Sequence, residues 1–378
     1  MKRNSIKIAL FCLPLCIIMA SCQKATDKPG PAETEVSDPA SANRDHFPQD
    51  LKDFTQINIV GDDNRFNPLH TNANLVNAWG VVFPTSGPAW VTAFGGGESF
   101  IFNADGTAPR PPVTIPSHAS TTGGHPTGIV FNTTSDFKLS NGSPARFIFA
   151  EADGIISGWN GTNAAQKMAD DSAGEVYLGI ALASFNGNNF LYAANFSQGK
   201  IDVYDKNLVK IDMPFTDPTL PFGYTPLNIQ NIGSKLYVMY GQPGTGDDVI
   251  SHRNGFIDIF NPDGSFVKRF ASQGRLNAPW GITKAPQGFY TNDDADDKNR
   301  EPQDVLLVSN FGDGRINAFT TEGESLGSLR AHGKPIEIEG LWGIAFAPAT
   351  SITVDHTTLF FAAGPGGEKH GLFGAIKR

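Results

Sequence analysis

The sequence predicts an all-β protein built from many short strands joined by turns. It contains 41 Gly and 26 Pro among 378 residues, which is well above the ordinary usage of these two residues. It also contains 28 Phe but only 5 Met, and only 18% of its residues are charged, which argues against helical bundles and coiled coils. Short runs of Phe, Val and Ile alternate with Gly, Pro, Asn and Asp, a pattern typical of strands separated by turns.

The net charge and the cysteine distribution exclude other classes of protein. The formal net charge is −9, whereas non-specific nucleic-acid binding needs clustered Lys and Arg, so we expect no nucleic-acid partner. Cys12, Cys16 and Cys22 are the three cysteines of the chain. The sequence after residue 22 therefore lacks disulfides and thiol chemistry.

The first 22 residues resemble a bacterial lipoprotein signal. Lys2, Arg3 and Lys7 precede an apolar stretch at residues 8–20, which is too short to span a bilayer comfortably. Small residues stand directly before Cys22, as in the lipobox at which the signal is removed and the cysteine is acylated. We expect residues 1–21 to be a lipoprotein signal peptide and Cys22 to carry the lipid. The alternative is an ordinary secretory signal or a short membrane anchor.

Residues 22–46 are expected to form the lipidated cysteine and a disordered linker. After Cys22 this segment has no aromatic residue and one β-branched aliphatic residue, Val36, so it offers too little apolar surface to fold. Pro29, Pro31 and Pro39 favour an extended tether. The globular domain is expected at residues 47–378.

A repeated pattern in this domain predicts the architecture. Each repeat opens with a strand that contains a glycine, namely Gly80, Gly128, Gly179, Gly281 and Gly343, with Asn228 in the fourth repeat. The five steps from position 80 to position 343 average about 53 residues, close to the period of β-propeller blades. We predict a six-bladed β-propeller with four-stranded antiparallel blades. Five or seven blades would require one repeat to be misread.

Three strands can be assigned in each repeat from its apolar runs. The expected strands of the successive repeats are residues 79–84, 89–94 and 99–102; 127–131, 146–150 and 154–159; 178–182, 190–195 and 199–204; 226–229, 235–240 and 255–260; 280–282, 305–310 and 314–319; and 342–348, 358–363 and 371–376. The sixth repeat lacks an outer strand, which residues 54–60 would supply from the N-terminal side, removing an open edge. The glycines of the first strands are expected where inner strands crowd the axis.

The predicted topology brings candidate binding residues to one end of the channel. The segments before the first strands and the loops between the second and third strands meet there. Eight polar residues are expected at this channel mouth: Asn77, His125, Glu151, Asn195, Asn228, Asn277, Asn310 and Asp313. Such a group of carboxamides, carboxylates and a histidine could bind a hydrated cation or a polyol. Alternatively, an Asn before a tight turn hydrogen-bonds its own backbone or adopts left-handed geometry.

Two acidic runs and a search for catalytic motifs complete the candidates. Residues 293–297 and 247–248 are rich in Asp, and oxygen ligands suit Ca²⁺. Neither run has the spacing of an EF-hand loop, so solvated loops are the other interpretation. The sequence contains no H-E-x-x-H, P-loop or G-x-S-x-G motif, which leaves metalloprotease, nucleotide and serine-hydrolase chemistry without support.

Several motifs carry a resemblance to known propellers. The W-G-[IV] strands at residues 79 and 342, the A-N-F and S-N-F turns at Asn195 and Asn310, and the G-x-I-[DN]-x-[FY] strands resemble an uncharacterised family of secreted bacterial six-bladed propellers with an NHL-repeat-like layout. The resemblance covers roughly residues 50–378 and implies the fold without an activity. The layout is also similar to gluconolactonase-type propellers, although their early Glu-Gly-Pro strand is missing. That similarity implies a divalent metal held by Glu151, Asn195 and Asn310.

We expect a lipid-anchored propeller of the bacterial cell envelope that binds a ligand, a protein or a carbohydrate without catalysis. It is expected to be a monomer, held by its lipid to the outer membrane because Gln23 follows Cys22. The alternative is a metal-dependent hydrolase or lactonase-like enzyme that uses Ca²⁺ or another divalent metal in the central channel. A metal at Glu151, Asn195 and Asn310 would favour the enzyme, whereas a channel filled by Phe and Trp side chains would favour the binding protein.

Overall fold

The computed structural model describes residues 51–244, 254–289 and 304–378. The expected signal peptide, Cys22, the linker and both acidic runs lie outside the described residues. Phe47–Arg378 forms one compact unit. In the described part of the chain, no helix has the length and apolar character needed to cross a membrane.

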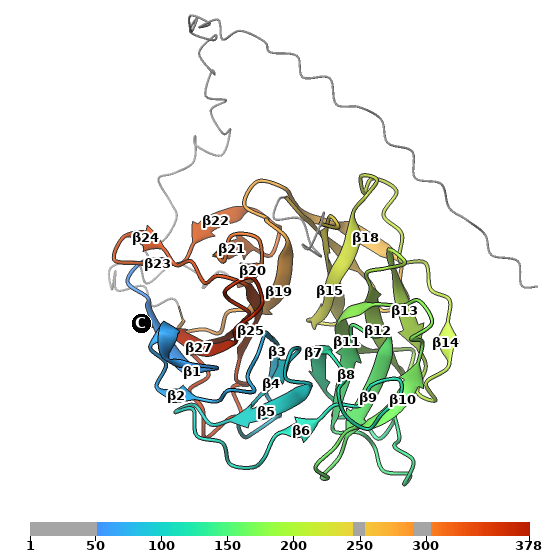
Figure 1. Ribbon diagram of the computed structural model, residues 1–378. Helices are drawn as coiled ribbons and strands as arrows, with labels where there is room; N and C mark the ends of the chain where they lie inside the picture. The colour runs from blue at the N-terminus through green and yellow to red at the C-terminus, as the bar shows by residue number, and fades with distance from the viewer. Residues whose placement is uncertain (1–50, 245–253, 290–303) are drawn as a thin grey trace, which may run out of the picture. The chain divides into compact units, whose positions relative to one another are not determined.

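The described strands form a six-bladed β-propeller, as predicted (Figure 1). The first five blades, given from inner to outer strand, are β3 (Ala78–Val82), β4 (Ala89–Ala93), β5 (Glu98–Phe102) and β6 (Val113–Thr114); β7 (Pro126–Phe131), β8 (Phe147–Glu151), β9 (Ile155–Trp159) and β10 (Gln166–Asp170); β11 (Tyr177–Phe185), β12 (Asn188–Asn195), β13 (Lys200–Tyr204) and β14 (Lys210–Ile211); β15 (Thr225–Ile232), β16 (Lys235–Gly241), β17 (Phe256–Phe260) and β18 (Phe266–Ser272); and β19 (Pro279–Lys284), β20 (Val305–Asn310), β21 (Ile316–Thr320) and β22 (Ser325–Ser328).

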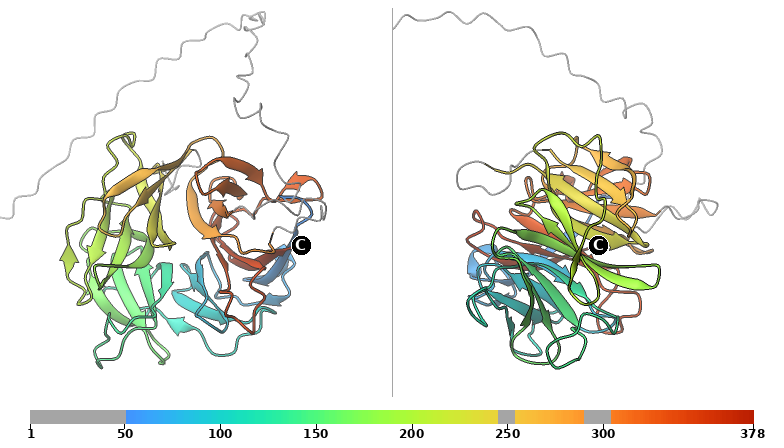
Figure 2. Two further views of the ribbon diagram at one scale, coloured as in Figure 1. Left: turned by 180° about the vertical axis from the view of Figure 1, so that it is seen from behind. Right: turned by 90° about the vertical axis from the view of Figure 1, so that its right-hand side faces the viewer.

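The sixth blade is closed by the N-terminal strand. It consists of β25 (Leu341–Phe346), β26 (Leu359–Ala363), β27 (Leu372–Lys377) and β1 (Thr55–Gly61), and β1 pairs antiparallel with β27. Both views of the ring show the blue β1 beside the red β27 (Figures 1 and 2). This confirms the predicted closure.

Four short elements were not predicted. The strand β2 (His70–Thr71) pairs parallel with β1 and adds a fifth strand to the last blade. The 3-10 helix η3 (Asn64–Phe66) lies between β1 and β2. A small hairpin of β23 (Arg330–Ala331) and β24 (Lys334–Pro335) connects the fifth and sixth blades. Each is at most three residues long, too short to leave a periodic pattern in the sequence.

The inner strands form a closed ring around the channel. Each of β3, β7, β11, β15, β19 and β25 contacts the inner strands of both neighbouring blades. A Cβ atom on Gly80 would lie 2.7 Å from the carbonyl oxygen of Thr127 in the second blade, and one on Gly343 would lie 2.5 Å from that of Trp79 in the first. Because no side chain fits between backbones at this distance, the predicted crowding at the axis is confirmed.

The core lies in layers between the blades. On β12, Leu191 and Ala193 pack with residues of the second blade such as Ile148. The intervening Tyr192 faces the fourth blade, where it packs in one cluster with Val238. The period-two alternation of a strand therefore places apolar side chains on both faces, which accounts for the strands that are apolar throughout.

Candidate functional site

The central channel is closed at the end where the inner strands begin. Trp79, Trp280 and Trp342 each stand directly before the glycine of an inner strand. The rings of Trp79 and Trp342 stack with centroids 3.6 Å apart, and the ring of Trp280 meets each of them edge-on at 6.0 Å. None of the three residues is more than 3% exposed. Their rings therefore fill the axis of the propeller.

Neighbouring residues fix these rings in place. Leu178, Leu227 and Phe311 belong to the same buried cluster, and the Phe311 ring stacks on Trp342 at 3.9 Å. The indole Nε1 of Trp342 donates to Oδ1 of Asn77, and that of Trp280 donates to the carbonyl oxygen of Leu178, both at 3.2 Å. We call the three tryptophans with Leu178, Leu227 and Phe311 the tryptophan plug.

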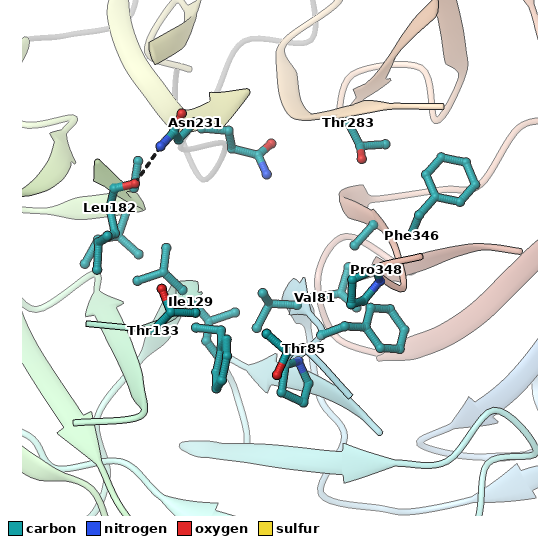
Figure 3. A pocket seen from close by; sticks show the side chains of 18 of the residues that line it. Val81, Thr85, Ile129, Thr133, Leu182, Asn231, Thr283, Phe346 and Pro348 are labelled. Carbon is teal, nitrogen blue, oxygen red and sulfur yellow. Dashed lines mark hydrogen bonds between the residues drawn. The ribbon is translucent and has the colours of Figure 1, made fainter. Parts of the chain in front are cut away.

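The opposite end of the channel holds a cavity of about 510 Å³, which we call the funnel. All six inner strands contribute to it from their middle or last residues. Figure 3 shows Val81 and Ile129 near its centre, with Leu182, Phe346 and Pro348 around them. Among the described residues that line the funnel, none has an ionisable side chain. The volume is typical of small-molecule sites, and the lining is mainly apolar.

A few uncharged polar groups lie on the rim of the funnel. Nδ2 of Asn231 donates to the carbonyl oxygen of Leu182 at 2.9 Å (Figure 3), and Oε1 of Gln230 accepts from the backbone nitrogen of Ile282 at 2.6 Å. These bonds join neighbouring blades and orient both amides. Nε2 of Gln230 and Oδ1 of Asn231 form no hydrogen bond with another described residue, so a donor and an acceptor remain for a bound molecule.

A second cavity of about 390 Å³ adjoins the funnel. The two cavities share Thr85, Phe131 and Thr133 in their linings, so we call the second one the side pocket. It lies over the first and second blades and is more polar than the funnel. Arg146 is the one charged residue among the described residues that line either cavity.

The asparagines that precede or open first strands are used inside the fold. Asn228 donates from Nδ2 to the carbonyl oxygen of Trp280 at 2.8 Å, and its Oδ1 accepts from the backbone of Ile229. Asn77 has a φ of 51°, in the left-handed region that Asn tolerates, and donates from Nδ2 to Glu368 at 2.8 Å. Asn277 has a buried Oδ1 without a hydrogen-bond partner, so it is the one of the three with an unsatisfied amide.

Asn195 belongs to a hydrogen-bond network within the third blade. Its Nδ2 donates to Asp202 at 2.8 Å, and its Oδ1 accepts from Ser197 at 3.0 Å. Asp202 also accepts from the Tyr177 hydroxyl at 2.9 Å and pairs with Lys210 at 3.0 Å. Both ends of the Asn195 amide are therefore occupied.

Asn310 and Asp313 form a turn in the fifth blade. Nδ2 of Asn310 donates to the carbonyl oxygen of Arg275 at 2.7 Å and to Oδ1 of Asp313 at 3.1 Å. The same Asp313 oxygen accepts from the backbone nitrogen of Arg315. Oδ1 of Asn310 is buried without a partner. The pair thus closes its own turn and leaves one amide oxygen unsatisfied.

Glu151 is the buried carboxyl of the predicted group. It is 0% exposed, its Oε1 accepts from Ser157 at 2.6 Å, and its Oε2 has no partner. Burial raises the pKa of Glu151 well above its ordinary value because the charged form is poorly solvated there. The nearby His125 is half-exposed, and its hydrogen bond with Asp153 raises the pKa of the imidazole.

The three proposed metal ligands therefore have separate partners. Glu151 is bonded to Ser157, Asn195 to Asp202 and Asn310 to Asp313, each within its own blade. The three residues stand at the ends of β8, β12 and β20, on the side of the propeller where the tryptophan plug fills the axis.

Sequence reasoning missed a compact polar group at the closure of the ring. Asp62, Asp63 and His370 have ligand atoms within 4.8 Å of one another. The Arg65 guanidinium pairs with Asp63 at 2.7 Å and contacts Nε2 of His370 at 2.6 Å. Arg65 thus pairs with Asp63, while Nδ1 of His370 contacts Asp62 at 2.6 Å, so the group fastens the segment after β1 to the last blade. Only the predicted pairing of residues 54–60 with the last repeat could have brought positions 62 and 370 together.

A Ser-His-Asp group on the second blade lacks the geometry of a catalytic triad. Oγ of Ser172 and the carboxylate of Asp170 both contact Nδ1 of His118, at 2.8 Å and 3.0 Å. A triad needs the acid and the nucleophile on different ring nitrogens. Lys167 also pairs with Asp170 at 2.7 Å, so the group is a surface network of hydrogen bonds.

Two viral proteins are similar in sequence to most of this chain. No family model matches it. "Uncharacterized protein R648" of Acanthamoeba polyphaga mimivirus is 33% identical over 343 residues, covering 85% of this chain and 80% of that protein. "Uncharacterized protein L690" of the same virus is 30% identical and covers 85% of each chain. These relatives are viral, so the comparisons do not support the expectation that the family consists of secreted bacterial proteins.

Solved structures are similar only at a low level. Virginiamycin B lyase from Staphylococcus aureus matches with a TM-score of 0.48 and 15% identity, covering 86% of this chain and 99% of that chain. A streptogramin B lyase structure gives the same TM-score with 12% identity. Likeness at this level carries no conclusion about the activity of this chain.

Proposed function

This chain belongs to the same family as proteins R648 and L690 of the mimivirus, and we propose that it is a binding protein. The funnel holds a small molecule, or the uncharged and mainly apolar part of one, and the protein does not change it chemically. The observation that supports this proposal is the funnel lining, whose described residues are mostly apolar and include no ionisable side chain.

The two ends of the channel together favour binding over catalysis. General acid–base catalysis and metal-dependent hydrolysis need an ionisable group or a metal ligand beside the substrate. The described lining of the funnel offers amides and threonine hydroxyls, such as Gln230, Asn231 and Thr283. These groups can orient a ligand by hydrogen bonds, and the apolar residues supply the affinity by burying its surface.

Fluorescence titration of the full chain with N-phenylnaphthylamine, an uncharged apolar dye, tests the proposal. We expect saturable binding that an apolar alcohol such as decanol reverses. Thr283, which is half-buried on the funnel rim (Figure 3), is replaced in the variant Thr283→Trp. The added ring should narrow the funnel and weaken dye binding by about tenfold, equivalent to about 1.4 kcal/mol.

Thr121→Trp is the matched control. Thr121 is exposed between β6 and β7 and does not line the funnel, so this variant should bind the dye like the wild type. The proposal is wrong if the wild type shows no saturable binding, or if both variants bind as the wild type does.

The metal-dependent alternative has weaker support, because both amide atoms of Asn195 are occupied, and Glu151 and Asn310 each keep one unpaired oxygen but are bonded within different blades. Melting the full chain with and without EDTA, after metal analysis, distinguishes the two. We expect no shift in the melting temperature. A bound metal whose removal lowers the melting temperature, in the wild type but not in Glu151→Gln, would instead favour the enzyme.

We also propose that a lipid on Cys22 anchors the protein to a membrane of the bacterial cell envelope. The support is the basic segment, the short apolar stretch and the small residues before Cys22. In a bacterial host, an alkyne-tagged fatty acid should label the wild type and leave Cys22→Ser unlabelled. Labelling of both proteins, or of neither, would contradict the anchor.

A further inference from the structure

We propose that the funnel and the side pocket form one composite site for an amphipathic anion, whose acidic headgroup binds Arg146 and whose apolar chain enters the funnel. This inference rests on the proposed function and specifies the chemical class of the ligand. A fatty acid is the simplest molecule of this class.

The shape of the two cavities supports one continuous site. Thr85, Phe131 and Thr133 belong to both linings, so the funnel and the side pocket lie directly side by side and one elongated molecule can contact both. The funnel contributes about 510 Å³ and the side pocket about 390 Å³. Their combined space suits an elongated molecule with two chemically different ends.

The charge distribution identifies which end goes where. The described funnel lining has no charge, whereas Arg146 lines the side pocket. Described arginines that form ion pairs are Arg65, Arg269 and Arg315, and Arg146 is not among them. Its guanidinium instead lies over the Phe131 ring, 5.6 Å from the centroid, and this ring lines both cavities. The cation is thus held at the junction with its hydrogen-bond donors available.

A carboxylate or another planar anion suits this position. A guanidinium presents a rigid fork of N–H donors that matches the two oxygens of a carboxylate. Thr133 and Asn160 also line the side pocket, where they can hydrogen-bond the same headgroup. The overall charge of −9 disfavours anions elsewhere on the surface, so the preference should depend on Arg146 itself.

The test compares decanoate with decanol, two probes with the same chain length and different headgroups. Each is used to displace N-phenylnaphthylamine from the full-length wild type and from Arg146→Gln. We expect the variant to bind decanoate roughly fivefold more weakly, as for loss of a partly exposed charge-assisted hydrogen bond. Its affinity for decanol should stay within about twofold, and Arg146→Lys should recover part of the decanoate affinity.

Lys138→Gln is the matched control, because Lys138 is exposed in the same loop of the second blade but lines neither cavity. It removes the same charge and should leave both affinities unchanged. The composite site is wrong if Arg146→Gln leaves the affinity for both probes unchanged or lowers both affinities equally. It is also wrong if Lys138→Gln weakens decanoate binding as much as Arg146→Gln does. In each of these cases the proposal of funnel binding stands. If neither decanol nor decanoate displaces the dye, funnel binding fails and the composite site fails with it.

Discussion

The two ends of the central channel are built from the same six strands and differ in what those strands carry. Where the strands begin, large side chains point to the axis, and Trp79, Trp280 and Trp342 meet there. Where the strands end, medium-sized residues such as Val81 and Ile129 leave a cavity. A propeller therefore separates two tasks along one axis: one end holds the ring together, and the other end is available for binding.

The largest effect is expected from breaking the closed end. Trp342 is 1% exposed and stacks against Trp79 and Phe311, so Trp342→Ala leaves a large cavity on the axis. We expect it to lower the free energy of unfolding by about 3–5 kcal/mol, measured by urea denaturation. Trp342→Phe keeps an aromatic ring and should cost less.

The same pair of variants tests whether the two ends are independent. Trp342→Phe should bind N-phenylnaphthylamine as the wild type does, because the plug and the funnel share no lining residue. Loss of dye binding in this folded variant, or a Trp342→Ala protein as stable as the wild type, would remove the division between the two ends.

A smaller effect is expected from the contact between the last and first blades. A Cβ atom on Gly343 would lie 2.5 Å from the carbonyl oxygen of Trp79, so Gly343→Ala must push two inner strands apart. Overpacking of this kind costs about 1–3 kcal/mol. In the control Gly174→Ala, the nearest atom to the new Cβ is the end of the Gln198 side chain at 3.8 Å. The free energy of unfolding of this control should therefore be unchanged or slightly higher. Equal stability of the two variants would show that the ring tolerates expansion.

The smallest effect concerns Glu151 and distinguishes a buried structural carboxyl from a metal ligand. Burial raises the pKa of Glu151 in the folded state above its unfolded value, so the unfolded chain loses this proton first. The contribution of Glu151 to stability is therefore full below the unfolded pKa, near 4.5, and falls as the pH rises through the folded pKa.

Glu151→Gln removes this pH dependence, because the amide does not titrate. The urea midpoint of the variant, relative to that of the wild type, should be higher at about pH 8 than at about pH 5. If the variant is instead less stable than the wild type at the higher pH, and added Ca²⁺ enlarges the difference, Glu151 is a metal ligand.

The repeat pattern predicted most of the fold because it is a local signal repeated six times. Short-range alternation of apolar and turn residues predicts the glycine in each inner strand and the three strands per repeat. The need to pair every strand edge predicts the closing strand at residues 54–60. The structure confirms the six blades and the pairing of β1 with β27. The short β2 and the β23–β24 hairpin depend on tertiary contacts and leave no such pattern.

The site was harder to predict, because it depends on side chains from different blades meeting across the axis. The predicted topology places polar candidates such as Asn277 and Asn310 at one end of the channel, but it does not show that three indoles fill that end. Likewise, the use of Asn195 and Asn228 inside their own or the next blade is a matter of side-chain direction. The funnel is lined mainly by ordinary strand residues such as Ile129 and Leu182, which no motif distinguishes.

The pairing of β1 with β27 has a consequence for how this protein is made. The first strand of the propeller leaves the ribosome before every other blade strand and must wait for β27, which follows them all in the chain. Until β27 arrives, β1 has an unpaired edge that could join a neighbouring nascent chain. The two ends of the domain are therefore joined only after synthesis of the last blade. The closed ring then forms as a whole, rather than blade by blade.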